Sequence, residues 1–462
     1  LGAITALVLL FPFTFGLPPT SAMLMIGGIM GGASFGGAIT AILLNTPGMA
    51  PNAATCFDGY PMAQKGEAGK AIGAAGVASS LGGLFGVVIL IAILPLAQSI
   101  ILAFGPAEFF VLAILGLCAI AVATEGLFLR GLAVGGIGLL LGTIGEDPMM
   151  AVPRFTGGWF YLYDGLPLIP ALIGIFGVCE MLRLSARGGT IAQSRSDVGK
   201  ISGVGAGVVA VFTHWRTLLQ GSTIGAVIGI IPGLGGTVAS FLSYAFARQT
   251  SKAPETFGKG NIEGVIAPEA ANNAKDGGSL LPTLAFGIPG SAETAVFLGA
   301  MVIHGLQPGP MMLIENEGVI LSLVIALSLS CVLAGLIGIF SARYLTMITR
   351  VDSAVLVPIV LGIAFVGTFA VRNSIGDVFL ALTFGVIGYL MIRFNFPRIT
   401  MIIGLVLGAI AERSYHQSLM ISRGDFGIFF ASGVAKIILL TLMVAMVAVV
   451  IQRLVKMRRA LS

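Results

Sequence analysis

The stretch AILLNTPGMAP, residues 41–51, carries Asn45-Thr46-Pro47-Gly48 directly behind four apolar residues. Proline has no backbone N–H and glycine holds a helix poorly, so the sequence predicts that a helix breaks here. In an apolar surrounding, a break leaves N–H and C=O groups without partners at a cost of several kcal/mol each. The function of such a break is therefore the first question that the sequence raises.

The composition identifies the class of the protein. Of 462 residues, 56% are hydrophobic and only 10% are charged, whereas soluble domains carry about 25% charged residues. Apolar runs of about 20 residues recur along the chain, which is the length that an α-helix needs to cross a bilayer. We therefore predict an all-α polytopic membrane protein and exclude a soluble multidomain enzyme. The formal net charge of +5 suits cytoplasmic loops and does not indicate nucleic-acid binding.

The motifs of metal-binding and nucleotide-hydrolysing enzymes are absent from the sequence. The four cysteines are scattered and form no CxxC pair, so we expect neither a disulfide framework nor a transition-metal site. The chain contains no HExxH motif and no Walker A motif. We therefore expect no enzyme activity and no cofactor.

Two pairs of similar segments indicate an internal repeat. GGAITAILLNTPGMAPNAAT (36–55) resembles GGSLLPTLAFGIPGSAETAV (277–296), and their Pro-Gly pairs lie 242 positions apart. LGAITALVLL at the start of the chain resembles LGGTVASFLS, which begins 233 positions later at Leu234. These matches predict two homologous halves, 1–182 and 217–462, with a basic cytoplasmic linker and interfacial segment at 183–216. We expect the N-terminal part of the first half to precede Leu1.

The placement of lysine and arginine predicts that the two halves are inverted, because loops rich in these residues stay in the cytoplasm. Residues 247–264 are rich in cations, whereas their counterpart at 11–20 has no charge. In the next pair of loops the bias reverses, because 57–70 carries two lysines and 304–318 carries no lysine or arginine. Equivalent loops thus fall on opposite sides of the membrane. This is an inverted-topology repeat, an architecture found in many secondary transporters.

The predicted topology places a hairpin and a broken helix in each half. Between Arg216 and Arg248 the chain leaves the cytoplasmic side and returns, and each arm of about 15 residues spans only about 22 Å of the roughly 30 Å hydrocarbon layer. This predicts a re-entrant hairpin with its tip at residues 232–235. Between Asp276 and His304 the chain crosses once, which predicts a discontinuous helix broken at Pro289-Gly290. In the first half, the corresponding tip is expected near Leu1-Gly2 and the corresponding break at residues 45–48.

The breaks predict a binding site for an anion and its coupling cation. Helix N-termini favour anions, while unwound carbonyls and hydroxyls favour Na⁺ or H⁺. We expect the substrate to contact residues at and just after both Pro-Gly pairs: Thr46, Pro47, Gly48, Pro289, Gly290, Ser291 and Thr294. We expect the cation to be held by residues of the breaks, the hairpin tip and the segment before the second break: Asn45, Thr46, Gly233, Gly235, Thr237, Asn273, Gly287 and Ser291.

Simpler interpretations of the same residues exist. A single Pro-Gly pair in a membrane helix is more often a kink than a site, although here the pattern occurs in both halves with hydroxyl or amide neighbours. The GLGG stretch at 233–236 is compatible with tight helix packing as well as with a hairpin tip. Asn272 and Asn273 either cap the second broken helix or reach the site.

Four long segments are similar to a known transporter family. GAVIGIIPGLGGTVASFLSYAFAR (225–248) and RNSIGDVFLALTFGVIGYLM (372–391) resemble its signatures, as do residues 16–63 and 264–310, which contain the two Pro-Gly breaks. The family is the large membrane subunit of tripartite tricarboxylate transporters, TctA. Residues 395–404 and 422–434 depart from its usual pattern and lie outside the predicted site.

The resemblance implies a function. It implies a permease subunit in the bacterial inner membrane that works with a small TctB-like membrane subunit and a periplasmic TctC-like solute-binding protein. It further implies import of citrate-like tricarboxylates or related carboxylates, driven by a Na⁺ or H⁺ gradient, and a relation to elevator-type carboxylate transporters. The alternatives are a passive carboxylate channel, an intramembrane enzyme and a membrane scaffold that does not transport. A channel should show a continuous polar stripe and an enzyme paired catalytic residues at membrane depth, and neither is evident.

Overall fold

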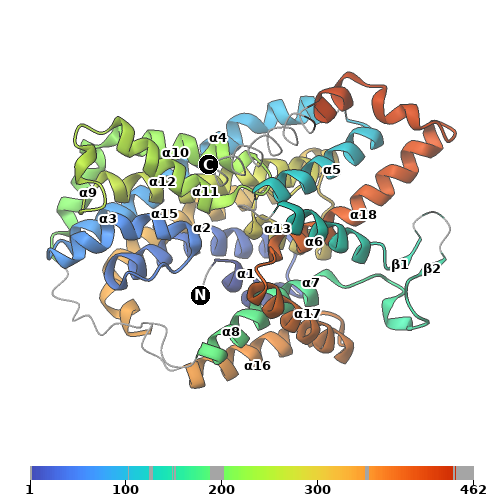
Figure 1. The fold of residues 1–462 in the computed structure, drawn as a ribbon, viewed down its shortest axis with the longest axis horizontal. Helices are drawn as coiled ribbons and strands as arrows, with labels where there is room; N and C mark the ends of the chain where they lie inside the picture. Colours follow the sequence, from blue (N-terminus) through green and yellow to red (C-terminus); the bar gives the residue numbers. More distant parts are fainter. Residues whose placement is uncertain are drawn as a thin grey trace, which may run out of the picture.

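The computed structural model describes residues 3–440 and 443, apart from 102–103, 124–127, 148, 150–151, 188–201 and 349–352. Over these residues the chain is almost entirely helical, and one two-stranded antiparallel sheet extends from the helices (Figure 1). The hairpin tip predicted near Leu1-Gly2 and residues 188–201 of the predicted linker lie outside the described residues.

The helices follow one another closely. Up to the linker the elements are α1 (Ala3–Leu10), η1 (Phe11–Thr14), α2 (Pro19–Leu44), η2 (Ala50–Asn52), α3 (Ala53–Gln64), α4 (Ala68–Ile101), α5 (Pro106–Ala123), α6 (Phe128–Leu141), β1 (Gly145–Glu146), β2 (Pro153–Arg154), η3 (Phe160–Leu162), α7 (Leu168–Leu172), the π-helical η4 (Ile173–Val178) and α8 (Cys179–Arg187). After the linker they are α9 (Val204–Thr213), α10 (Trp215–Ile230), α11 (Gly235–Thr250), η5 (Pro254–Thr256), α12 (Glu263–Phe286), α13 (Ala292–Ile303), α14 (Pro310–Glu315), α15 (Glu317–Ile348), α16 (Ser353–Arg372), α17 (Ile375–Arg393), α18 (Arg398–Ile421) and η6 (Phe426–Phe430).

The expectation of a multi-pass helical membrane protein is confirmed. Six of the described helical segments are long and apolar enough to cross a membrane: Pro19–Leu44, Ala68–Ala97, Leu168–Ala186, Glu317–Ala342, Ala354–Arg372 and Ile375–Arg393. Large apolar side chains on α15 and α16 face outward, with Phe340 and Val366 among the most exposed. A bilayer accommodates such outward-facing apolar surface, whereas water does not.

The central helices pack through small residues. Helix α4 lies along α12, and α2 lies along α15. A Cβ atom added at Gly82 or Gly86 of α4 would come within 2.4 Å of a carbonyl oxygen of α12. On α2, a Cβ added at Gly27 would lie 3.2 Å from the Leu323 carbonyl oxygen of α15, and one at Gly31 would lie 2.9 Å from the Leu327 carbonyl oxygen. Glycine therefore permits backbone contact at both crossings, as small residues do in membrane bundles generally.

Two further groups of helices flank this centre. Helix α18 packs against α5 and α6, and α17 packs against α7, η4 and α8 (Figure 1). The segment between α6 and α7 contains β1 and β2. It forms polar contacts with helices of both groups. Arg154 forms an ion pair with Glu412 of α18 at 2.5 Å, while the Tyr161 hydroxyl donates to Asp377 of α17 at 2.6 Å.

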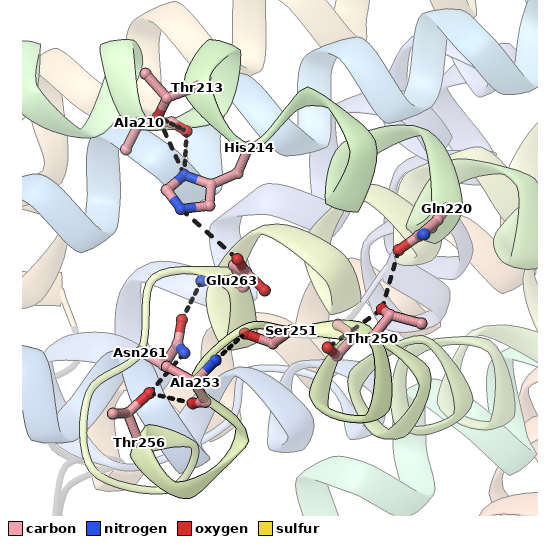
Figure 2. Close-up of polar contacts among 11 residues, drawn as sticks. Ala210, Thr213, His214, Gln220, Thr250, Ser251, Ala253, Thr256, Asn261 and Glu263 are labelled. Atoms are coloured by element: carbon pink, nitrogen blue, oxygen red, sulfur yellow. Dashed lines mark hydrogen bonds and ion pairs between the residues drawn. The ribbon is translucent and has the colours of Figure 1, made fainter.

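The start of α12 is held by polar contacts from two sides. His214, between α9 and α10, lies 3.6 Å from the Glu263 carboxylate, and Asn261 accepts a hydrogen bond from the Glu263 N–H (Figure 2). From α3, Asp58 accepts from the N–H groups of Gly260 and Asn261 at 2.8 and 2.7 Å. The sequence predicts that the second crossing begins at Asp276, and the structure places this residue inside a helix that begins earlier, at Glu263. The polar segment 267–278 therefore belongs to the buried helix.

Candidate functional site

The first break follows α2. This helix ends at Leu44, and Asn45 adopts the left-handed conformation with φ 49° and ψ 30°. The freed N–H groups find partners within the same helix, because Thr46 donates to the Thr40 carbonyl and Gly48 to the Gly37 carbonyl, both at 3.3 Å. Asn45, Pro47 and Gly48 are exposed. The first break is thus an open turn whose strain is taken by a residue type that tolerates positive φ.

The second break follows α12. The helix ends at Phe286, Gly287 takes φ 68°, and the next helix starts after Ser291. Ser291 and Thr294 form a capping box, in which the Ser291 N–H donates to the Thr294 hydroxyl at 2.9 Å and the Thr294 N–H to the Ser291 hydroxyl at 3.3 Å. Residues 287–291 are all buried. This break is therefore enclosed and capped by its own side chains.

The hairpin of α10 and α11 reaches the second break. Each arm has 16 residues, and the tip contains Gly233 with φ 83° and Gly235 with φ 61°. The Gly233 N–H donates to the Gly290 carbonyl at 3.0 Å. A Cβ added at Gly290 would lie 2.7 Å from the Gly229 carbonyl of α10. Glycine is needed at 290 because the two backbones touch there, and it suits 233 because of the positive φ at that position.

The start of α11 also approaches the segment that follows the first break. A Cβ added at Gly236 would lie 2.8 Å from Asn272 Oδ1, 2.9 Å from Pro51 and 3.0 Å from Lys275 Cε. The hairpin tip, the second break, η2 and the middle of α12 therefore converge on one region. This region is the candidate site.

A buried carboxylate joins the two parts of the chain in this region. Glu269 of α12 is fully buried and accepts hydrogen bonds from Asn52 Nδ2 at 3.1 Å, from Ser79 Oγ of α4 at 3.0 Å and from the Thr55 hydroxyl of α3. In the described part of the chain, no lysine, arginine or histidine lies within ion-pair distance of Glu269. Neutral donors from the N-terminus of α3 and from α4 therefore hold this side chain.

A buried ion triad lies one to two turns further along α12. Lys275 Nζ is 2.6 Å from Asp276 Oδ1 and 3.3 Å from Glu293 Oε2, and the Lys275 side chain is 1% exposed. Glu293 stands in the first turn of α13. The triad thus connects the helix before the second break to the helix after it. Ionised groups are expensive in this setting and mark functional sites in membrane proteins.

Comparison with known proteins assigns the chain to a family. Residues 1–403 match the model of the tripartite tricarboxylate transporter TctA family. The chain belongs to the TctA family. It is therefore a membrane subunit of a transporter family and not an enzyme, as expected.

Two relatives from Agrobacterium vitis are similar to this TctA chain. An uncharacterized 52.8 kDa protein in the TAR-I ttuC' 3'region is 34% identical over 445 residues, which cover 94% of this chain and 86% of that protein. An uncharacterized protein in the TAR-II ttuC' 3'region is 33% identical over 211 residues, which cover 46% of this chain and 87% of that protein. No solved structure matches the chain.

The residues that the sequence predicted for the site of this TctA protein lie in three places: where the hairpin tip meets the second break, inside α12, and at the first break. Gly233, Gly290 and Ser291 come together where the hairpin tip meets the second break, with Gly235, Gly287, Pro289 and Thr294 on the same segments. Asn273 lies buried on α12, and Thr237 lies in the first turn of α11. Asn45, Thr46, Pro47 and Gly48 lie at the first break. Their roles in binding remain predictions.

The structure adds four acidic or basic residues that the sequence analysis missed: Glu269, Lys275, Asp276 and Glu293. Two of them bear on the expectation that the N-termini of the half-helices bind the anionic substrate. Glu269 and Glu293 already bring protein carboxylates to the N-termini of α3 and α13. One signal for their burial was present in the sequence. Ala267, Ala270, Ala271 and Ala274 recur at helical spacing, and they mark a closely packed helix running through the charged segment.

Proposed function

We propose that this TctA chain is the large transmembrane permease subunit of a binding-protein-dependent secondary transporter that imports tricarboxylates or related carboxylates. A Na⁺ or H⁺ gradient drives it, and it resides in the bacterial inner membrane. It acts with a TctB-like small membrane subunit and a TctC-like periplasmic solute-binding protein, because the family is tripartite. The observation that carries the proposal is the contact between the hairpin tip and the second break, through Gly233 and Gly290.

The helix pairing supports an inverted-repeat, elevator-type organisation. Suppose that α2 of the first half corresponds to α12 of the second, and that α4 corresponds to α15. An inverted repeat then requires that, on exchange of the halves, the contact between α4 and α12 has an equivalent between α15 and α2. Both pairs are present. The same exchange relates the packing of α18 on α5 and α6 to that of α7, η4 and α8 on α16 and α17. In this organisation α10 and α11 form a re-entrant hairpin, and the two broken helices carry the substrate.

Uptake measurements with the gradients collapsed test the transport mechanism. The full transporter with its partner subunits takes up labelled citrate in vesicles under an imposed Na⁺ gradient, an imposed pH gradient, or both. We expect uptake to stop when both gradients are collapsed, even with ATP inside. Undiminished uptake in that condition would rule out secondary transport.

Cysteine labelling tests the inverted repeat separately. The repeat places Gly66, between α3 and α4, in the cytoplasm and Asn316, between α14 and α15, on the opposite side. A membrane-impermeant maleimide applied from outside should therefore label Asn316→Cys and leave Gly66→Cys unlabelled. Reaction of both positions from the same side would contradict the inverted topology.

A further inference from the structure

The triad on α12 carries an unbalanced charge. Lys275 contributes one positive charge, and Asp276 and Glu293 contribute two negative charges, so the net charge of the ionised triad is −1. Among the described residues, no other lysine, arginine or histidine lies within ion-pair distance of either carboxylate. A net charge in a low-dielectric interior is strongly unfavourable unless a counter-charge compensates it.

The oxygen atoms that face this imbalance have no partners. In the part of the chain that the structure describes, Asp276 Oδ2 accepts no hydrogen bond, and neither side-chain polar atom of Asn273 or Asn272 has a hydrogen-bond partner. All three residues are at most 2% exposed. Buried polar groups are nearly always satisfied in folded proteins, so this group of unpartnered atoms calls for a ligand.

These atoms share a region of α12. Asn273 and Asp276 are three residues apart, and residues at this spacing are neighbours on a helix surface. The Ser34 hydroxyl of α2 faces the Asp276 carboxylate and the Cys331 thiol of α15 faces Asn273, although neither contact has the geometry of a full hydrogen bond. Three helices therefore meet at an oxygen-rich position, deep in the bundle.

The charge and the donor atoms define the ligand. One positive charge brings the triad to neutrality, whereas a divalent ion would leave an excess of positive charge. Carboxylate, amide and hydroxyl oxygens favour hard cations. We propose that Asp276, together with Asn273, binds one Na⁺ ion, which neutralises the Lys275–Asp276–Glu293 triad.

Of the cation ligands that the sequence predicts, this position includes Asn273 and none of the residues at the breaks, because Asp276 lies three turns before Gly287. The inference rests on the proposed function only in naming the bound cation as the coupling ion. The occupancy itself is a property of the folded chain. The bound cation is linked to both helices of the second break, because Asp276 on α12 holds the cation while the neighbouring Lys275 holds Glu293 on α13.

Thermal unfolding of the purified full chain in detergent tests the proposal without substrate, gradient or partner subunit. NaCl is titrated against choline chloride at constant ionic strength and fixed pH, and pH is then varied in choline chloride. Asp276→Asn is compared with Asp58→Asn, a matched control. Asp58 is also fully buried, but N–H groups of Gly260 and Asn261 and the Tyr244 hydroxyl satisfy its carboxylate.

The pH series separates ion binding from titration of the groups that lie around Asp276, which are Lys275, Glu293 and Cys331. We expect the wild-type midpoint to rise with Na⁺, by about 2 °C for each tenfold increase in its concentration above the dissociation constant. Asp276→Asn should abolish the response, because the remaining Lys275–Glu293 pair is already neutral, and Asp58→Asn should retain it.

The stability of Asp276→Asn shows whether loss of the response results from loss of the cation or from misfolding. Without the cation, Asp276→Asn should be at least as stable as the wild type, because it removes an uncompensated buried charge. Asn273→Ala should weaken the apparent affinity without abolishing the response. An Asp276→Asn variant that responds to Na⁺ like the wild type, or a wild type that responds to pH alone and not to Na⁺, would overturn the proposal. Loss of gradient-driven uptake with an intact cation response would instead count against the proposed function.

Discussion

The two breaks have the same backbone plan and different surroundings. In each, a long helix ends in a left-handed residue, Asn45 or Gly287, and a 12-residue helix follows. The first break is exposed, whereas the second is buried beneath the tip of the α10–α11 hairpin. The local sequence thus determines where the chain breaks, and the elements packed over a break determine its access to water and ions.

The electrostatics of the two breaks differ as well. Near the first break, neutral donors from Asn52, Thr55 and Ser79 hold the Glu269 carboxylate. At the second break, Lys275 holds two carboxylates, and one of them belongs to the helix beyond the break. Charge therefore joins the two helices of the second break, while hydrogen bonds join the first break to α12. This difference leads to four predictions.

Chemical labelling should show the largest contrast. Pro47 is exposed and the equivalent Pro289 is buried, so in the detergent-solubilised chain Pro47→Cys should react readily with a maleimide and Pro289→Cys only after denaturation. The wild-type chain, with its four native cysteines, gives the background. Equal reaction of the two variants would show that the second break is as open as the first.

Substitution of Gly290 should abolish transport. A Cβ at this position would lie 2.7 Å from both the Gly229 carbonyl and the Ser279 Cβ, so Gly290→Leu must separate the hairpin tip from the break. We expect complete loss of uptake with membrane insertion preserved, measured by uptake assays and by the amount of protein in the membrane. Gly36→Leu is the matched control, because a Cβ at Gly36 meets no atom within 4 Å. Normal transport by Gly290→Leu would remove the second break from the site.

Removal of the positive charge of Lys275 should destabilise the protein strongly. Lys275→Met leaves Asp276 and Glu293 buried without their partner, and breaking a buried pair in this way costs about 3–5 kcal/mol. Glu269→Gln is the control near the first break. Glutamine keeps an acceptor for the neutral donors and loses only the charge assistance, which amounts to about 1 kcal/mol. Denaturation of both variants in detergent measures the contrast, and similar losses would mean that charge does not distinguish the two breaks.

The sequence predicted the backbone of the site better than its charges. Proline and glycine act locally, so the ends of α2 and α12 followed from residues 45–48 and from Pro289-Gly290. The triad did not follow, because Lys275 and Glu293 lie 18 positions apart on different helices. Its charges also led the segment around Asp276 to be interpreted as the approach to a helix. The burial of that segment depends on contacts with α4 and α10, which no local pattern specifies.

The smallest effect is expected at Ser291, and it separates two roles for this residue. Its hydroxyl accepts from the Thr294 N–H, and the Thr294 hydroxyl accepts from the Ser291 N–H. Loss of one such cap costs about 0.5–2 kcal/mol. If capping is its whole role, Ser291→Ala and Thr294→Ala should lower the unfolding midpoint by similar amounts and leave the KM for substrate unchanged.

A ligand contact would behave differently. The sequence predicts that the Ser291 hydroxyl also binds the substrate carboxylate or the cation. In that case Ser291→Ala should raise the KM for one of them, whereas Thr294→Ala, which removes the same cap, should leave both KM values unchanged. The first break provides the reference, because neither η2, whose N-cap is Met49, nor α3, whose N-cap is Asn52, has a side-chain cap. If the second break binds its ligand through backbone N–H groups alone, the two variants should not differ in KM. Parallel measurement of midpoint and KM for the two variants decides between the roles.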